Sequence, residues 1–204
     1  MEENYLDDLK TIRQLMNRSS RFLSLSGISG VAAGIVGIAA AWFFEQYFLT
    51  TENWLVYQAV SINAEQRLLL VVTALAALFT AIGLVLFFTW KETKKNGEKV
   101  WDLQSKRLLI NLGIPLVSGG IFCLMVLDKG YIGWLPALTL IFYGCALVNG
   151  SKYTVDEIRT LGLIEILTGL LAFYFISFSV YLWGIGFGLM HLIYGIIIYK
   201  KRRS

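Results

Sequence analysis

Long apolar runs alternate with short polar segments along the whole chain. Six runs reach, or nearly reach, the about 20 mostly apolar residues that a membrane-spanning helix needs. None shows the period-two alternation of a barrel strand, and in lipid a helix pairs its backbone polar groups within one segment. The pattern therefore predicts an all-α polytopic bundle of six transmembrane helices in a single membrane domain, residues 1–204. The six spans are about 22–44, 68–90, 108–127, 131–148, 160–182 and 184–199.

The composition supports this prediction. The 204 residues are 56% hydrophobic and 16% charged, and their mean hydropathy is +0.63. Soluble globular chains have about 45–50% apolar and about 25% charged residues. An ordinary cytosolic enzyme, a disordered regulator and a secreted disulfide scaffold are therefore excluded. The acidic, polar start MEENYLDDLK lacks the basic region of a signal peptide.

The basic residues predict the orientation of the bundle. In the six-span arrangement, sixteen of the 18 lysines and arginines lie on one side, and only Arg67 and Lys129 lie on the other. The positive-inside rule then puts both termini in the cytoplasm. Because anionic lipid headgroups attract such a basic face, we expect lipid contact there and no nucleic-acid binding.

Two cytoplasmic segments are candidates for interaction. Residues 1–20 contain apolar side chains at helical spacing and predict an amphipathic helix that lies on the membrane, docks on the bundle or binds a protein partner. The 91–107 segment is the longest cytoplasmic loop, and Asn96-Gly97 marks a turn in it. On the other side, the segment of about 49–66 is modestly apolar and is expected to fold back as a small lid.

Small residues four apart in the first span form a helix-packing face. Such faces let helix backbones approach closely in lipid. Packing within the chain and a homo-oligomer interface both remain open. Arg107 and Arg159 begin spans three and five in similar sequence, which predicts an internal repeat of two-helix hairpins. The packing residues are Ser26, Gly30, Gly34 and Gly37.

Glu165 and His191 are the two ionisable residues that lie well inside a predicted span. Such residues are costly in lipid and by default mark a functional site. With the last hairpin turning near Trp183, simple pairing places His191 opposite Tyr174, so the two need not touch. They can nevertheless face one polar track. Its other members are Asn111, Thr168, Tyr143 and Tyr194. The alternative is structural: Glu165 pairs with Arg107 or Arg159 near the interface, and His191 bonds a tyrosine or a carbonyl.

The sequence contains no motif for enzymatic chemistry. Walker A, GxGxxG, HExxH, GxSxG and CxxC patterns are all absent. A single histidine, and cysteines only at Cys123 and Cys145, make a metal cluster hard to build. We therefore expect no catalytic residue, no metal and no cofactor.

Several segments together resemble a family of small six-span bacterial inner-membrane proteins. They are RQLMNRSSRFLSLSGISG, WDLQSKRLLINLGIPLVSGG, LTLIFYGCALVNGSKYT and GIGFGLMHLIYGIIIY, and the similarity covers most of the chain. The three-hairpin pattern is also distantly similar to the HdeD-like acid-resistance membrane proteins. The resemblance implies a multi-pass protein of the bacterial inner membrane, and brings no substrate, cofactor or catalytic residue to particular positions.

Three functions follow from these patterns. The leading hypothesis is a small transporter or channel-like bundle in which Glu165 responds to protons or cations. The second is a non-catalytic membrane sensor, assembly factor or regulator that acts through the N-terminal helix and the 91–107 loop. The third is a lipid-facing enzyme.

Overall fold

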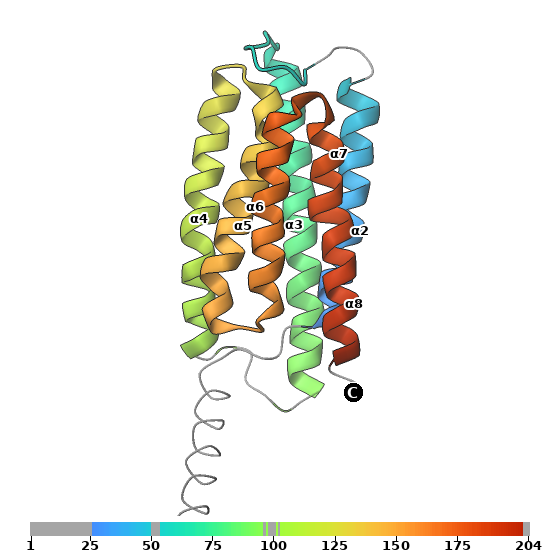
Figure 1. Ribbon diagram of the computed structural model, residues 1–204, viewed down its shortest axis with the longest axis vertical. Helices are drawn as coiled ribbons and strands as arrows, with labels where there is room; N and C mark the ends of the chain where they lie inside the picture. Colours follow the sequence, from blue (N-terminus) through green and yellow to red (C-terminus); the bar gives the residue numbers. More distant parts are fainter. Residues whose placement is uncertain (1–25, 50–53, 96, 98–100, 102, 202–204) are drawn as a thin grey trace, which may run out of the picture.

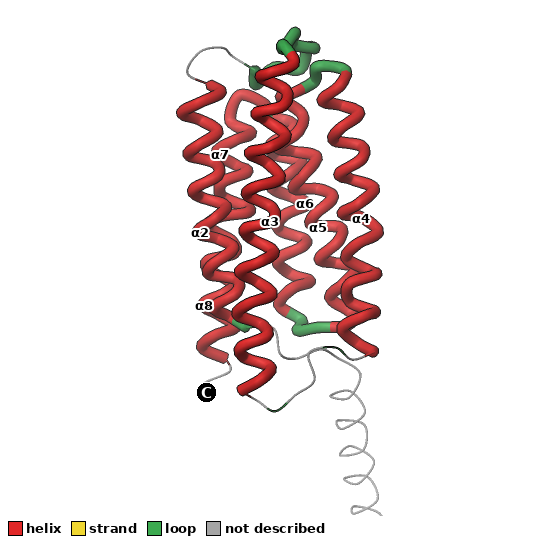
Figure 2. The backbone as a smooth tube through the Cα atoms, turned by 180° about the vertical axis from the view of Figure 1, so that it is seen from behind, coloured by secondary structure: helices red, strands yellow, loops and turns green. Residues whose placement is uncertain are grey.

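The computed structural model describes residues 26–49, 54–95, 97, 101 and 103–201, and within these ranges every regular element is helical. The helices stand side by side along the long axis, and successive ones alternate in direction, except that α7 and α8 follow one another in the same direction (Figure 1). The same parallel arrangement is visible from behind in Figure 2. The α-helices are α2 (Gly27–Phe44), α3 (Ala64–Lys95), α4 (Leu103–Asp128), α5 (Leu135–Gly150), α6 (Glu157–Tyr174), α7 (Ser179–Trp183) and α8 (His191–Lys201). Two π-helical segments, η1 (Glu45–Leu49) and η5 (Gly184–Met190), and three 3₁₀ turns, η2 (Ile132–Trp134), η3 (Ser151–Tyr153) and η4 (Ile176–Phe178), continue or connect them.

Five helical segments of the described chain are long and apolar enough to cross a membrane. They are Gly27–Phe48, Ala64–Lys95, Leu103–Asp128, Ile132–Tyr153 and Ile176–Lys201. These segments confirm the all-helical, multi-pass membrane class. The remaining segment, α6, has 18 residues and includes Glu157, Arg159 and Glu165, so it has no 18-residue stretch with two or fewer charged residues.

The predicted boundary between the last two spans is wrong. The chain turns at Phe175 and η4, because α6 ends at Tyr174 and the segment from Ile176 to Lys201 is one nearly continuous helix. The phenylalanine N–H groups close this turn: Phe175 donates to the carbonyl of Leu171, and Phe178 donates to that of Phe175. Trp183 and Gly184, the predicted turn, lie inside the returning helix. The true turn is eight residues earlier, so the register of the whole hairpin differs from the prediction.

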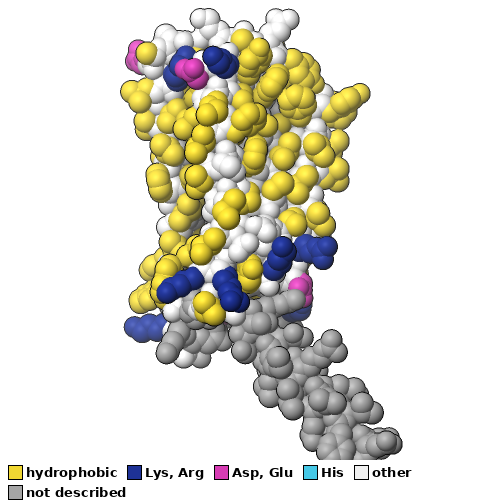
Figure 3. Space-filling view, turned by 90° about the vertical axis from the view of Figure 1, so that its left-hand side faces the viewer, with side chains coloured by type: hydrophobic (Ala, Val, Ile, Leu, Met, Phe, Trp, Pro, Cys, Tyr) yellow, Lys and Arg dark blue, Asp and Glu magenta, His cyan; other side chains and the backbone are white. Residues whose placement is uncertain are grey.

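Helices α2, α5, α6 and α8 form the packed core of the bundle, and α3 and α4 lie on its outside. α5 packs on α6, and α2 packs along η5 and α8. α3 lies on α2 and α4 lies on α5, both with most of their large apolar side chains exposed. Figure 3 shows one face, with hydrophobic side chains over its middle and Lys and Arg gathered toward the lower end. An exposed apolar band of this kind suits lipid rather than water.

The described part of the loop before α3, residues 54–63, folds over the upper end of the bundle, where the sequence predicts a small lid. Trp54 is buried against Phe48 and Ile132. The Tyr57 hydroxyl lies 2.9 Å from the Phe173 carbonyl oxygen and 2.6 Å from that of Tyr174, so it donates at the end of α6. The described part of this loop therefore ties the α2–α3 connection to the other two hairpins at the upper end.

The amphipathic helix predicted at 1–20 lies outside the described residues, as do 96, 98–100 and 102 of the 91–107 loop. The first five residues of that loop continue α3 to Lys95. Gly97 has a φ of +68°, which fits the turn expected at Asn96-Gly97.

The glycines of α2 face the returning segment of the last hairpin. A Cβ on Gly30 would clash with Gly195, and one on Gly34 or Gly37 would clash with the backbone of Gly188 or Phe187. Ser26, buried at the start of α2, accepts from the backbone N–H and the hydroxyl of Ser29 through its carbonyl. The stripe therefore packs inside the chain, where only glycine allows the backbones to approach.

Candidate functional site

Three polar side chains from three helices meet in the core. Tyr143 comes from α5, Glu165 from α6, and His191 is the first residue of α8. The Tyr143 hydroxyl lies 2.7 Å from Nε2 of His191, and Nδ1 of His191 lies 3.4 Å from Oε1 of Glu165. Glu165 is 0% exposed and His191 is 6% exposed. We call these three residues the Tyr–His–Glu cluster.

The hydrogen bonds of His191 determine which of its nitrogens carries a proton. Nδ1 lies 3.1 Å from the carbonyl oxygen of Gly186, which can only accept, so Nδ1 is the donor. In the neutral ring Nε2 is then the acceptor, and Tyr143 donates to it. If His191 gains a proton, Nε2 becomes a donor and the Tyr143 oxygen must accept instead. The Tyr143–His191 bond therefore exists in both charge states, with opposite polarity.

Glu165 is the group whose hydrogen-bonding needs are least met. Among the described residues, neither carboxylate oxygen has a hydrogen-bond partner, and the His191 ring is its ion-pair contact. Glu165 lies midway along α6, about 12 Å from Glu157 and about 14 Å from Tyr174 at 1.5 Å per residue. An unpaired buried carboxylate is costly. This favours either a proton on Glu165 or a shared charge with His191.

The π-helical segment η5 gives the cluster its shape. A Cβ on Gly186 would clash with Oε2 of Glu165, so only glycine leaves room for the carboxylate. The wider π-turn places His191 five residues after Gly186, and its side chain returns to that carbonyl. Single π-turns inside α-helices occur frequently at functional sites. The alternate glycines Gly184, Gly186 and Gly188 are thus explained by close packing on both sides of η5.

Apolar packing closes the bundle on either side of the cluster. Toward the upper end lies the buried group Ala137, Leu140 and Ala172. Toward the lower end lie Leu147, Ile158, Leu161 and Ile198. Phe187 stacks on His191 with ring centroids 6.1 Å apart. The polar cluster is therefore enclosed between two apolar layers in this conformation.

The other predicted members of the polar track lie apart from the cluster. Thr168, one turn along α6 from Glu165, donates to the carbonyl of Ile164 at 2.8 Å. The side-chain amide of Asn111 donates to the backbone carbonyl of Arg107. The backbone carbonyl of Asn111 accepts from the side-chain amide of Asn149. Tyr194 packs on the lower apolar group. The track of six residues thus reduces to the three-residue cluster, with Thr168 nearby. Arg107 and Arg159 are exposed, and the ion pair that Glu165 forms is with His191.

Ser179 is a buried polar residue outside the cluster that the sequence pattern did not single out. It is fully buried at the start of α7, and its hydroxyl has no partner among the described residues. A serine in an apolar run is common in membrane helices, so its sequence context carries little signal. It adds one polar atom to the upper half of the core, above Glu165.

A metal site is not found in the described part of the chain, where no three His, Cys, Asp or Glu side chains group together. Cys123 and Cys145 are both free thiols. Comparison with protein-family models, with curated proteins and with solved structures finds no match. The resemblance to the six-span inner-membrane family and to the HdeD-like proteins therefore stays a prediction.

Proposed function

We propose that this protein is a small proton-coupled transporter of the bacterial inner membrane, in which Glu165 binds and releases the coupling proton. The observation that carries the proposal is the Glu165 carboxylate itself, which is completely buried and contacts His191, while neither of its oxygens has a hydrogen bond from any described residue. Ionisable residues inside a membrane bundle by default serve ion or proton pathways.

The cluster has the parts that a proton exchange needs. Glu165 holds the proton in its neutral state, and the Nδ1–H group of His191, 3.4 Å from Oε1, faces the carboxylate that remains when this proton leaves. A proton that binds at Nε2 charges the ring, and Tyr143 then accepts from Nε2 instead of donating to it, since a hydroxyl can do both. Loss of the proton leaves a negative charge on Glu165 beside a positive ring, so each proton movement changes the local charge balance. Such a change favours a different helix arrangement.

The packing around the cluster favours a carrier over an open channel. Apolar groups lie above and below the cluster, so protons reach it only when one layer opens. Transporters commonly bind their ions near the middle of the membrane, at interrupted helices. η5 is an interruption of this kind, and it borders Glu165 directly.

The proposal includes six spans, with α6 as the fifth, and both termini in the cytoplasm. The basic residues support it: Lys94, Lys106 and Arg159 belong to the same end of the helices, while Arg67 pairs with Asp128 at 2.8 Å at the other end. The ion pair of Glu157 with Lys201, at 2.5 Å, closes the basic end between α6 and α8.

Cysteine labelling tests whether α6 crosses the membrane. We expect Lys152→Cys, in the α5–α6 turn, and Ser177→Cys, in the α6–α7 turn, to react from opposite sides. Both positions are exposed, and Cys123 and Cys145 would first be replaced by alanine. A membrane-impermeant maleimide should label Ser177→Cys in intact spheroplasts, and Lys152→Cys only after permeabilisation. Labelling of both from one side would mean that α6 does not span.

Proton flux tests the function. In proteoliposomes that contain a pH-sensitive dye, we expect wild-type protein to carry protons after a pH jump, and Glu165→Gln to carry at least about tenfold fewer. A tenfold loss corresponds to about 1.4 kcal/mol, which is modest for a carboxylate that is completely buried in the core. Glu92→Gln, on the basic end of α3, makes the same chemical change outside the cluster and should retain the flux.

Flux no higher than in empty liposomes, from folded and inserted protein, would contradict the proposal. The alternative of a membrane sensor, assembly factor or regulator would then take its place. That alternative depends on residues 1–20 and on the 91–107 loop, which lie wholly or partly outside the described residues. Its test is co-purification of a cytoplasmic protein that is lost when residues 1–18 are deleted.

A further inference from the structure

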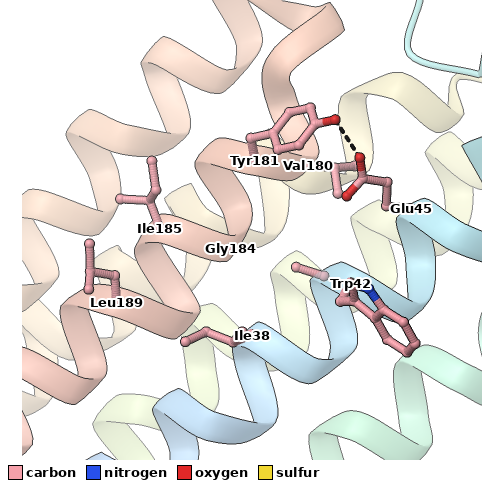
Figure 4. A pocket seen from close by; sticks show the side chains of 9 residues that line it. Ile38, Trp42, Glu45, Val180, Tyr181, Gly184, Ile185 and Leu189 are labelled. Carbon is pink, nitrogen blue, oxygen red and sulfur yellow. Dashed lines mark hydrogen bonds between the residues drawn. The ribbon is translucent and has the colours of Figure 1, made fainter.

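A lipid-facing groove runs between α2 and the last hairpin, away from the Tyr–His–Glu cluster. It encloses about 220 Å³. Figure 4 shows α2 on one side and α7 with η5 on the other, and the side chains that line the groove between them. Its residues are Ile38, Ala41, Trp42, Glu45, Val180, Tyr181, Gly184, Ile185 and Leu189.

The lower part of the groove is suited to a hydrocarbon chain. Ile38, Ile185 and Leu189 are exposed to the membrane at 41–45%. Gly184 has no side chain, and a Cβ there would meet Ala41, so the bare backbone of η5 forms the base of the groove. The result is an apolar channel along the bundle surface, and the close approach of Gly184 to Ala41 forms its base.

The upper end of the groove is polar and negative. Glu45 is its one charged lining residue, and the Tyr181 hydroxyl donates to Oε1 of this carboxylate (Figure 4). Trp42, 62% exposed, stands one turn below Glu45 on α2. Glu45 lies about 27 Å along α2 from Gly27 at 1.5 Å per residue, which is close to the hydrocarbon thickness of a bilayer. The carboxylate is therefore at the level of lipid headgroups.

We infer that this groove binds a phospholipid whose headgroup carries a primary ammonium, such as phosphatidylethanolamine, in the outer leaflet. The ammonium would bond to Glu45, whose position Tyr181 fixes. Carboxylates bind ammonium groups through ionic hydrogen bonds. The acyl chain would follow the apolar walls. An anionic headgroup would meet Glu45 with like charge, so the groove selects against it.

Native mass spectrometry of the full chain tests the inference. The protein would be released from nanodiscs of equimolar phosphatidylethanolamine and phosphatidylcholine. We expect bound phosphatidylethanolamine to exceed phosphatidylcholine by about fivefold, the effect of one partly exposed ionic hydrogen bond. Glu45→Gln should bring the ratio to about one, and Tyr181→Phe should reduce it. Glu65→Gln, an exposed carboxylate at the same end on α3, is the matched control and should leave the ratio unchanged.

Three results would overturn the inference. One is an equal amount of the two lipids on wild-type protein, and another is a ratio that survives in Glu45→Gln. The third is a mass of two chains that Glu45→Gln converts to one, because a second copy of the chain would then fill the groove. Proton flux plays no part in this readout, so the inference stands or falls separately from the transport proposal.

Discussion

Replacement of Gly37 by leucine is expected to lower the free energy of unfolding by about 3 kcal/mol. At Gly37 a side chain would meet the backbone carbonyl of Phe187 and the backbone nitrogen of Gly188, and backbone atoms cannot rotate out of the way. α2 would have to move away from η5. Overpacking of a well-packed interface costs typically about 1–3 kcal/mol, and a clash with backbone falls at the upper end of that range. Unfolding by denaturing detergent, followed by tryptophan fluorescence, measures the change.

Gly83 provides the matched control for this experiment. It lies in the middle of α3, and a Cβ there would meet nothing within 4 Å. Gly83→Leu should change the free energy of unfolding by less than about 1 kcal/mol, with a small gain because leucine is the better helix former. Equal losses in both variants would mean that the effect comes from leucine in a membrane helix, and not from the contact between α2 and η5.

The packing face of α2 could be predicted from its spacing, whereas its partner could not. Small residues four apart in α2 mark a face that suits close packing, and the pattern is the same for a neighbour in the chain and for a second copy. The partner residues Gly188 and Gly195 are seven apart, the spacing of one helix face, so the pattern does not say which two faces pair. Which faces meet depends on where the last hairpin turns, and the spacing of small residues does not give that position.

The contact between Glu165 and His191 was missed because the last turn carries no turn signal. The segment Phe175–Phe178 lacks the glycine, proline and asparagine that usually mark a turn. Trp183-Gly184 resembles a helix end at the membrane surface, yet it lies within a helix. Once the turn is placed at Phe175, Gly186 becomes the neighbour of Glu165, and His191 is five residues further on. The residue types of the site were therefore predictable, but their contact was not.

Replacement of Glu165 by methionine is expected to raise the free energy of unfolding by about 1–3 kcal/mol while it abolishes proton flux. The carboxylate oxygens have no hydrogen bonds among the described residues, so the folded state contains their full desolvation penalty. Methionine has a similar length and is unbranched and adaptable. Replacing a buried ionic group by an apolar side chain of similar volume is often neutral or stabilising. Unfolding in denaturing detergent and flux in proteoliposomes give the two readouts.

This double effect distinguishes a functional Glu165 from a structural one. A carboxylate that holds helices together would cost about 3–5 kcal/mol when removed, because its partner would be left buried and uncompensated. A carboxylate that serves proton exchange lowers the free energy of unfolding, and the packing of the rest of the bundle compensates for this loss. Thr168→Val, one turn along α6, is the control: its hydroxyl bonds only its own helix, at Ile164, so stability should change by less than about 1 kcal/mol and flux should persist. A Glu165→Met protein that is less stable than wild type would show that the His191 contact is a structural lock.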